Sequence, residues 1–354
     1  MINVFDITEF GAVGDGTTDS TEAIQKAMDA AKDCMGKVVV PPGKYIVKGD
    51  LKLRGEGVSL EGSSAWSFRN DGASVFILDN DKAECMIDIS GAFGCAIRGM
   101  SLNGKKLGNN INGIRLYWER YNGGGQEDTP TIDDCRIGNF SGNGLHFEHV
   151  WCFSVRHSMI YNNGGSGLCV SGWDAFIIDN WFTNNGKAGI SDCGYVASIT
   201  ATGNRVEWNR TAGFWFERGD SFNITGNFFD RTYGPALKLG SDDGEFNLAT
   251  CTGNVFRRSG AYDTPHSDKY WGSHLILNHC TGCVFSGNTM KVGAGDGATL
   301  PVSPDYGVIM KNCETSIFKD NTMRNGSIIE NLILENNTDC IIENNIGSVF
   351  EEEK

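Results

Sequence analysis

Four carboxylates in the sequence occupy positions that a repeating chain would bring together as two pairs. Glu207 and Asp230 each follow an asparagine of a repeated motif by three residues, whereas Asp192 and Glu217 each lie in the short stretch after a glycine. If successive repeats stack as neighbouring coils, the members of a pair are roughly 5 Å apart. Cleavage of a glycosidic bond needs two carboxyl groups about 5 to 9.5 Å apart. Glu207, Glu217, Asp230 and Asp192 are therefore the candidate catalytic residues.

Asp192 also has a purely structural interpretation. Its register predicts an inward-facing side chain, like those of Val170 and Phe216 in neighbouring repeats. A buried carboxylate is costly unless it is hydrogen-bonded or the strand ends and turns it outward. Both interpretations stay open at this point.

Aromatic and polar side chains accompany these acids. In the stretch after each glycine, apolar residues alternate with polar or aromatic ones, and this alternation predicts that the second set faces outward. Sugar rings stack on aromatic side chains, although ordinary exposure or turn packing could explain each residue alone. The candidate substrate-binding residues, including those of adjoining turns, are Trp215, Trp173, Asp174, Trp208, Asp220, His146, Glu148, Lys238, Arg231, Trp271 and Tyr117.

Three insertions interrupt the repeat, at 118–130, 261–274 and 293–306. Long excursions from a regular solenoid are often binding loops, so we expect them to wall a groove. The second insertion carries Asp263, His266, Asp268, Tyr270 and Trp271, which could reach a substrate, although a solvated loop is an equal alternative.

The repeat itself predicts the fold. Its motif is apolar-x-apolar-x-x-Asn, two apolar positions, a polar turn and a glycine, and most intervals are close to 23 residues. Three short strands joined by turns make one such coil, and coils bury their apolar side chains only by stacking. We predict an all-β parallel β-helix of about 10–13 coils, with a structural ladder of asparagines. The anchors are Met100, Cys135, Ser158, Asn180, Asn204, Asn227, Asn254, Asn288, Asn321 and Asn344.

The two ends of the chain fit one domain over 1–354. A helix over about 19–33, with Asp19 as its N-cap and Ile24, Ala27 and Met28 on one face, would plug the open end. We expect a cap over 1–50, coils over 51–346 and a frayed acidic tail over 347–354.

The opening of the chain resembles the pectate-lyase superfamily, and more narrowly proteins related to glycoside hydrolase family 28. The segments that carry the resemblance are 10–16 (FGAVGDG), Asp19, 23–25 (AIQ) and 40–45 (VPPGKY). The resemblance implies a right-handed, single-stranded β-helix that cleaves polysaccharides by hydrolysis or by elimination. The opening motif itself carries no chemistry.

The family's catalytic signature is not complete in this chain. Asn-Thr-Asp occurs only at 337–339, near the end of the sequence, and Gly-His-Gly and Arg-Ile-Lys do not occur, so the set is incomplete and its catalytic residues cannot be transferred. Lyase chemistry would need calcium-binding acids near an arginine or lysine base. Asp242, Asp243 and Glu245 could bind Ca²⁺, but no ligand spacing such as that of an EF-hand loop supports it. We expect no cofactor and no metal.

Composition limits the partners and the compartment. The net charge of −14 disfavours nucleic acid and anionic membranes, and also a polyanionic substrate unless a local basic groove overrides it. No apolar stretch is long enough to span a membrane and the N-terminus does not resemble a signal peptide. Twelve cysteines without a disulfide spacing pattern suggest reduced thiols. We expect a cytoplasmic protein or one released without a signal peptide.

The sequence thus favours a glycoside hydrolase acting on a poly- or oligosaccharide in a lateral groove. The alternatives are a polysaccharide lyase, a fructotransferase-type lyase on the same fold, and a non-catalytic glycan-binding module like those of phage tailspikes. β-Helices of the last type often form trimers, so a homotrimer is a further expectation.

Overall fold

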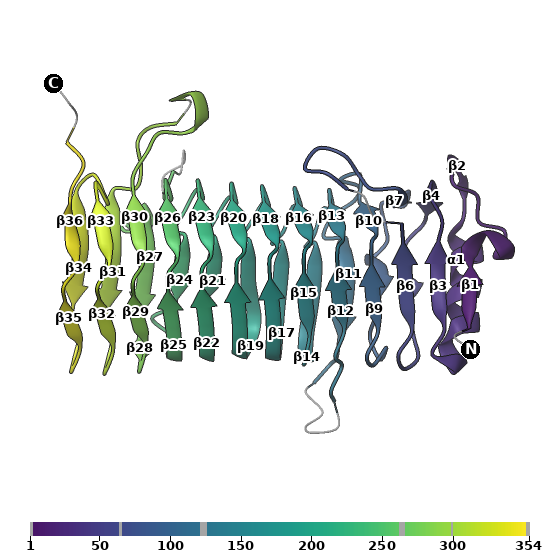
Figure 1. Ribbon diagram of the computed structural model, residues 1–354, viewed down its shortest axis with the longest axis horizontal. Coiled ribbons are helices and arrows are strands. Elements are labelled where there is room, and N and C mark those ends of the chain that lie inside the picture. The colour runs from purple at the N-terminus through teal and green to yellow at the C-terminus, as the bar shows by residue number, and fades with distance from the viewer. Residues whose placement is uncertain (1–2, 64–65, 121–125, 262–265, 299, 352–354) are drawn as a thin grey trace. The chain divides into compact units, whose positions relative to one another are not determined.

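The computed structural model describes residues 3–63, 66–120, 126–261, 266–298 and 300–351. The chain divides into two compact units, 1–181 and 182–354, and each is described by itself. The assignment of 1–354 as one domain stays a prediction. In both units the strands pair in parallel ladders with strands one coil away, as Figure 1 shows for each. The chain is a right-handed parallel β-helix, which confirms the predicted fold class.

The N-terminal unit contains the α-helix α1 (Thr21–Ala31), the short 3₁₀ helices η1 (Ile7–Phe10) and η2 (Lys32–Cys34), and the first strands. These strands are β1 (Val4–Asp6), β2 (Asp15–Asp19), β3 (Lys37–Val40), β4 (Gly43–Val47), β5 (Leu51–Lys52), β6 (Ser59–Gly62), β7 (Ser74–Leu78), β8 (Cys85–Asp88), β9 (Ala96–Arg98), β10 (Ser101–Asn103), β11 (Asn112–Tyr117), β12 (Thr131–Asp133), β13 (Arg136–Gly138), β14 (Leu145–Trp151), β15 (Ser154–Arg156), β16 (Met159–Tyr161) and β17 (Leu168–Ile178).

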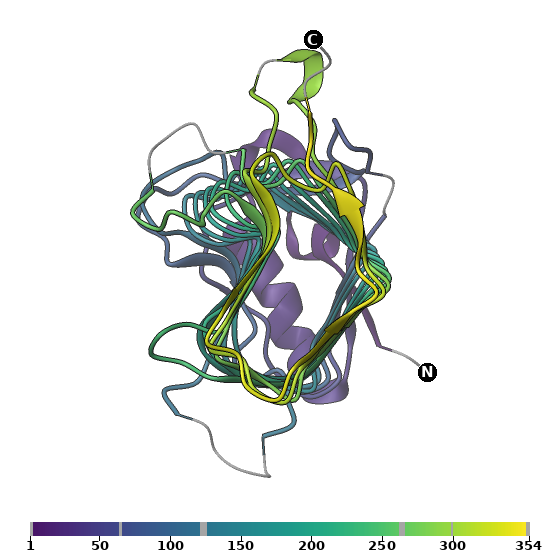
Figure 2. The ribbon, with the colours of Figure 1, turned by 90° about the vertical axis from the view of Figure 1, so that its left-hand side faces the viewer.

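The C-terminal unit is also built of coils, and β18 (Trp181–Thr183) lies at the boundary in the sequence. It also contains the 3₁₀ helix η4 (Asp296–Ala298) in a loop that projects from the coils (Figure 2). Its strands are β19 (Ile190–Thr202), β20 (Arg205–Glu207), β21 (Phe214–Phe216), β22 (Gly219–Thr225), β23 (Phe228–Asp230), β24 (Leu237–Leu239), β25 (Phe246–Thr252), β26 (Val255–Arg257), β27 (Ser273–Asn278), β28 (Cys280–Thr281), β29 (Val284–Ser286), β30 (Thr289–Lys291), β31 (Tyr306–Lys311), β32 (Ile317–Lys319), β33 (Thr322–Arg324), β34 (Glu330–Glu335), β35 (Ile341–Glu343) and β36 (Ile346–Ser348).

The helix α1 covers the N-terminal end of the first coils. It packs against η1, β1, β3 and β5 through the predicted face, in which Ile24, Ala27 and Met28 are buried. Its N-cap is Ser20 rather than the predicted Asp19, and the helix is shorter than 19–33. Asp19 instead accepts hydrogen bonds from the backbone N–H and the hydroxyl of Thr21. At the other end β36 runs to Ser348, so the coils extend beyond the predicted limit of 346.

The asparagine ladder is confirmed, with one correction at its last member. In the C-terminal unit Asn204, Asn227, Asn254 and Asn288 each donate to the side-chain oxygen of the next member, one coil away, at 2.9 to 3.0 Å. The final member is Asn345, which bonds the backbone and side chain of the preceding rung, and not the predicted Asn344. The left-handed residue of each of these turns is the one before the anchor, often a glycine, and not the anchor itself.

Loss of one rung should destabilise the C-terminal unit. The Nδ2 of Asn227 donates to the carbonyl of Ala201, and its Oδ1 accepts from Asn204. Asn227→Ala leaves these buried groups unsatisfied, and each costs about 1–3 kcal/mol. We expect unfolding by urea at a clearly lower midpoint than in Asn223→Ala, which alters an exposed asparagine of the same coil. Equal midpoints in the two variants would contradict a stabilising ladder.

His274 of β27 gives the C-terminal unit a predictable acid sensitivity. Burial lowers its pKa to about 3, below the value of about 6.5 in an unfolded chain. Above pH ~6.5 the imidazole is neutral in both the folded and the unfolded state. Between pH ~6.5 and 3 only the unfolded state binds a proton at this residue, so the free energy of unfolding falls by up to about 1.4 kcal/mol per pH unit.

The variant His274→Leu should accordingly lose less stability than the wild type between pH ~6.5 and ~4. His157→Gln, which alters a largely exposed histidine, should behave like the wild type. Parallel denaturation curves at each pH measure the effect, and an unchanged pH slope in His274→Leu would contradict it.

All twelve cysteines are free thiols in the structure, as expected from their spacing. Among the described residues no helix has the length and apolar character needed to cross a membrane.

Candidate active site

The outer face of β11 and β14 in the N-terminal unit forms a pocket of about 370 Å³. The strands are in parallel register, with Arg115 opposite His146 and Tyr117 opposite Glu148. Their apolar neighbours in both strands are buried, which confirms the predicted alternation. The pocket is lined by Ala83, Glu84, Asn109, Asn110, Asn112, Arg115, Tyr117, His146 and Glu148.

His146 is held between two partners in this pocket. Its Nε2 lies 2.6 Å from Glu148 Oε1, and its Nδ1 lies 2.9 Å from the amide nitrogen of Asn143. Burial is the largest single influence on the pKa of His146 and lowers it, but contacts with Cys169 and Glu148 together outweigh it, so the net pKa is raised. The imidazole therefore positions Glu148 and supplies it with a proton donor.

Arg115 and Tyr117 form the opposite part of the pocket. The Arg115 guanidinium lies 4.8 Å from the Tyr117 ring centre and 2.5 Å from Glu84, whose side chain is 76% exposed. Among the described residues, the Tyr117 hydroxyl and the second carboxylate oxygen of Glu148 have no hydrogen-bond partner. A ligand in the pocket would thus meet a cation, a phenol and a carboxylate.

Two further predicted residues of this unit lie on β17 and do not line the pocket. Trp173 is opposite Trp151 of β14, and the Trp151 indole N–H donates to Asp174. Asp174 has a left-handed backbone at φ 60°. The contact with Trp151 gives Asp174 a structural role. The roles of Trp173 and Asp174 in substrate binding stay predictions.

A second cluster of predicted residues lies on β19, β21 and β24 of the C-terminal unit. Trp215 is opposite Lys238, whose ammonium lies 5.3 Å from the indole ring centre. Burial lowers the pKa of Lys238, whereas Glu217 and Asp192 act to raise it and so lie near it. Asp192 is half-buried and its Oδ2 accepts from the Glu217 backbone N–H at 2.8 Å, so the strand has turned it outward. We call these four residues the Lys238 cluster.

Trp271 is not an open sugar platform, which corrects its predicted role. It is only 5% exposed and packs with Ile276 and Ile309, 5.3 Å from the Trp215 ring and stacked on His266. Asp263 of the same insertion lies outside the described residues. Asp220, also predicted, is half-buried and contacts the hydroxyl of Ser221.

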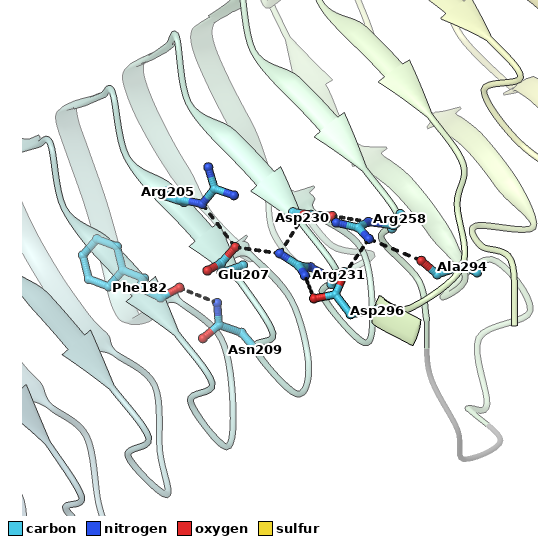
Figure 3. Close-up of polar contacts among 9 residues, drawn as sticks. All are labelled: Phe182, Arg205, Glu207, Asn209, Asp230, Arg231, Arg258, Ala294 and Asp296. Carbon is cyan, nitrogen blue, oxygen red and sulfur yellow. Dashed lines mark hydrogen bonds and ion pairs between the residues drawn. The ribbon is translucent and has the colours of Figure 1, made fainter. Parts of the chain in front are cut away.

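Glu207 and Asp230 are vertical neighbours, as predicted, but they do not face an open groove. They are 3% and 1% exposed. Arg231 Nη2 lies 3.1 Å from Glu207 and 3.0 Å from Asp230, and Arg258 donates to both oxygens of Asp230 (Figure 3). The expectation of a solvent-facing pair is wrong because arginines from adjacent coils bury and neutralise it. Arg231 also stacks on Trp208, which places both predicted residues in this network.

Within the described part of the chain no three His, Cys, Asp or Glu residues are arranged to hold a metal ion. Asp242, named above for Ca²⁺, instead accepts from Asn278 and contacts Lys311. The absence of a cofactor stays a prediction.

Sequence reasoning missed part of the pocket. Arg115 was visible as an outward residue by alternation, but Glu84 precedes the first anchor and Asn109, Asn110 and Asn112 lie in the irregular stretch between Met100 and Cys135. No spacing signal relates them to the later coils, and only the three-dimensional stacking does.

Residues 2–214 match the family described as rhamnogalacturonase A/epimerase, pectate lyase-like. The chain belongs to this family. The match covers the whole N-terminal unit, including the pocket, and confirms the resemblance to the pectate-lyase superfamily.

Known proteins extend this relationship. Over 199 residues the chain is 27% identical to mannuronan C5-epimerase AlgE4 of Azotobacter vinelandii, which covers 51% of this chain and 34% of that protein. The chain thus spans about a third of the length of this relative. The A-module of the same epimerase superposes with a TM-score of 0.60 at 17% identity, over 99% of this chain and all of the module. The Dettilon tailspike protein superposes at 0.61 and 13% identity, over 94% of this chain and 68% of that one. These superpositions establish a shared fold.

Proposed function

We propose that this chain is a carbohydrate-active enzyme that removes a proton next to the carboxylate of a uronic-acid residue in a polysaccharide. The observation that carries the proposal is the pocket of the N-terminal unit, which combines Arg115, Tyr117 and the Glu148–His146 pair. The relationship to mannuronan C5-epimerases supports the same class of reaction.

The pocket offers a group for each step of such a reaction. Arg115 would bind the sugar carboxylate in place of the exposed Glu84, as guanidinium groups bind carboxylates through paired hydrogen bonds. Glu148 would accept the proton of the adjacent carbon, leaving the electron pair delocalised onto the carboxylate that Arg115 holds. The Tyr117 hydroxyl would return a proton to the carbon, which inverts it, or to the departing glycosidic oxygen, which cleaves the chain. Epimerisation and elimination thus share one set of residues.

Charge sets a condition on this function. The net charge of −14 repels an acidic polymer, so local cations must hold it. A panel of alginate, pectate and neutral glucans in deuterated water tests the proposal. Either deuterium on the carbon next to the carboxylate in an intact chain, from epimerisation, or an unsaturated uronate at a new chain end, from elimination, is the expected result. New reducing ends with neither deuterium nor an unsaturated residue would refute it, and binding without any product would favour an adhesive role.

Glycoside hydrolysis is the second candidate, favoured by the Lys238 cluster. Asp192 is half-buried and Glu217 is exposed, and the Glu217 backbone N–H donates to the Asp192 carboxylate at 2.8 Å, beside a tryptophan on which a sugar can stack. Four acids, Glu217, Asp192, Asp268 and Asp242, influence Lys238, so a neutral glycan suits this surface better than an acidic one.

This candidate has its own test. If the Lys238 cluster hydrolyses a neutral glycan, Glu217→Gln and Asp192→Asn should each lower the release of reducing sugar by about 10²-fold or more. Asp243→Asn, which alters an exposed acid of the neighbouring turn, serves as the matched control. Release of reducing sugar that is equal in all three variants would exclude hydrolysis at this cluster.

A further inference from the structure

Three turn residues of the C-terminal unit form a column beside the buried acids. Trp208, Arg231 and Arg258 directly follow β20, β23 and β26, and each has a left-handed backbone with φ between 53° and 59°. Because Glu207, Asp230 and Arg257 are paired in register across these strands, the three turn residues stack. The Arg231 guanidinium lies 4.4 Å from the Trp208 ring centre.

The two arginines bind a single exposed carboxylate on their outer side. Arg231 Nη1 contacts one oxygen of Asp296, and Arg258 Nη1 lies 3.0 Å from the other (Figure 3). Arg258 also donates to the carbonyl of Ala294 at 3.4 Å. The Asp296 side chain is 61% exposed and belongs to the projecting loop between β30 and β31. An external anion therefore has access to the position that this carboxylate occupies.

The surroundings favour an anion even though the whole chain is acidic. Arg205, Arg231 and Arg258 face the two buried acids Glu207 and Asp230, so this group has a net charge of +1 once Asp296 is removed. Arg231 is 8% exposed, and its Nε is buried without a hydrogen-bond partner among the described residues. The column of Asp230 continues with Arg257 and Lys291, both exposed, on the next two coils.

We propose that Arg231 and Arg258 form a receptor for an anionic group carried by a sugar, a carboxylate or a sulfate, and that Asp296 occupies it in the unliganded protein. Two guanidinium groups with separate bonds to the two oxygens of one carboxylate match this ligand chemistry. Trp208, half-buried beside Arg231, offers a ring on which the attached sugar can stack. The receptor rests on the proposed function only in that both take an acidic glycan, and binding at the receptor does not depend on catalysis.

The Asp296 carboxylate belongs to the same chain, so its effective concentration at the two arginines is high and it competes with an external anion. Removal of this carboxylate should therefore leave both guanidinium groups available to the ligand. We expect Asp296→Ala to bind a tetragalacturonate at least about tenfold more tightly than the wild type in calorimetry at low salt. A neutral glucose tetramer should bind neither protein in this way. Adding Arg257→Gln and Lys291→Gln, which alter exposed residues, should reduce the gained affinity and its salt dependence.

Inorganic sulfate separates a general anion site from one that also recognises the sugar. Sulfate that raises the melting temperature of Asp296→Ala, but not of the wild type, supports the receptor; tighter binding of tetragalacturonate than of sulfate supports the contribution of Trp208. Equal affinity of Asp296→Ala and wild type for tetragalacturonate would overturn the proposal, as would equal binding of the neutral tetramer. These experiments measure binding at Arg231 and Arg258, so a negative result would not bear on catalysis in the N-terminal pocket. A lack of catalytic activity in that pocket would likewise not bear on the anion receptor.

Discussion

Glu148→Gln is expected to lower the rate of proton exchange on a polyuronate by about 10²- to 10⁴-fold, the range typical for loss of a general base. The amide cannot accept the proton, yet it fills the same volume beside His146, so the melting temperature should stay within a few degrees of the wild type. Deuterium incorporation, or formation of an unsaturated product if the reaction is elimination, measures the effect under saturating substrate. Glu245→Gln makes the same chemical change at an exposed glutamate of the other unit and should leave the rate unchanged.

The same variant has a signature that a merely structural role would not give. Because Glu148 raises the pKa of His146, its replacement by glutamine should lower that pKa. A titration of the imidazole followed by NMR reports it. An exchange rate in Glu148→Gln close to that of the wild type, with the His146 pKa lowered as expected, would remove Glu148 from the catalytic role while leaving the contact intact.

Asp230→Asn is expected to destabilise the C-terminal unit by about 3–5 kcal/mol. Removal of one partner from a buried ion network leaves its opposite charges uncompensated in a medium of low polarity. Asp230 faces the side chains of both Arg231 and Arg258 and is 1% exposed. Chemical denaturation measures the change in unfolding free energy.

Asp296 provides the matched control because it contacts the same two arginines from the solvent side. Exposed ion pairs are worth only about 0–1 kcal/mol, so Asp296→Asn should cost far less than Asp230→Asn. If the two variants were equally stable, the buried network would not be a stabilising element. If Asp230→Asn were stable but inactive, the original prediction of a catalytic Asp230 would regain support.

The fold was largely predictable because a solenoid repeats one physical solution. Each coil buries apolar residues at the same positions and satisfies the same backbone groups with an asparagine, so the period is visible in the sequence. Errors arose where neighbouring residues can fill the same role. The pair Asn344–Asn345 offers two anchors and the second is used, and Asp19 and Ser20 are both good helix caps.

The site was predictable only in part. Alternation along a strand placed Tyr117, His146, Glu148 and Lys238 on the outer face, because the pleat leaves no other choice. Burial of Glu207 and Asp230 depends on Arg258 and on a loop whose Asp296 is 65 residues from Arg231 in the sequence. The sequence near Glu207 and Asp230 does not indicate contacts with residues this far along the chain. The two acids were therefore predicted to be accessible to a substrate, whereas they are buried.

A crystal structure with a bound uronate oligosaccharide tests the central claim most directly. We expect a sugar carboxylate within hydrogen-bond distance of Arg115 and the adjacent carbon facing Glu148 and Tyr117 in the N-terminal pocket. An oligosaccharide bound with its reacting bond at Asp192 and Glu217 of the Lys238 cluster, and with the pocket empty, would contradict the claim.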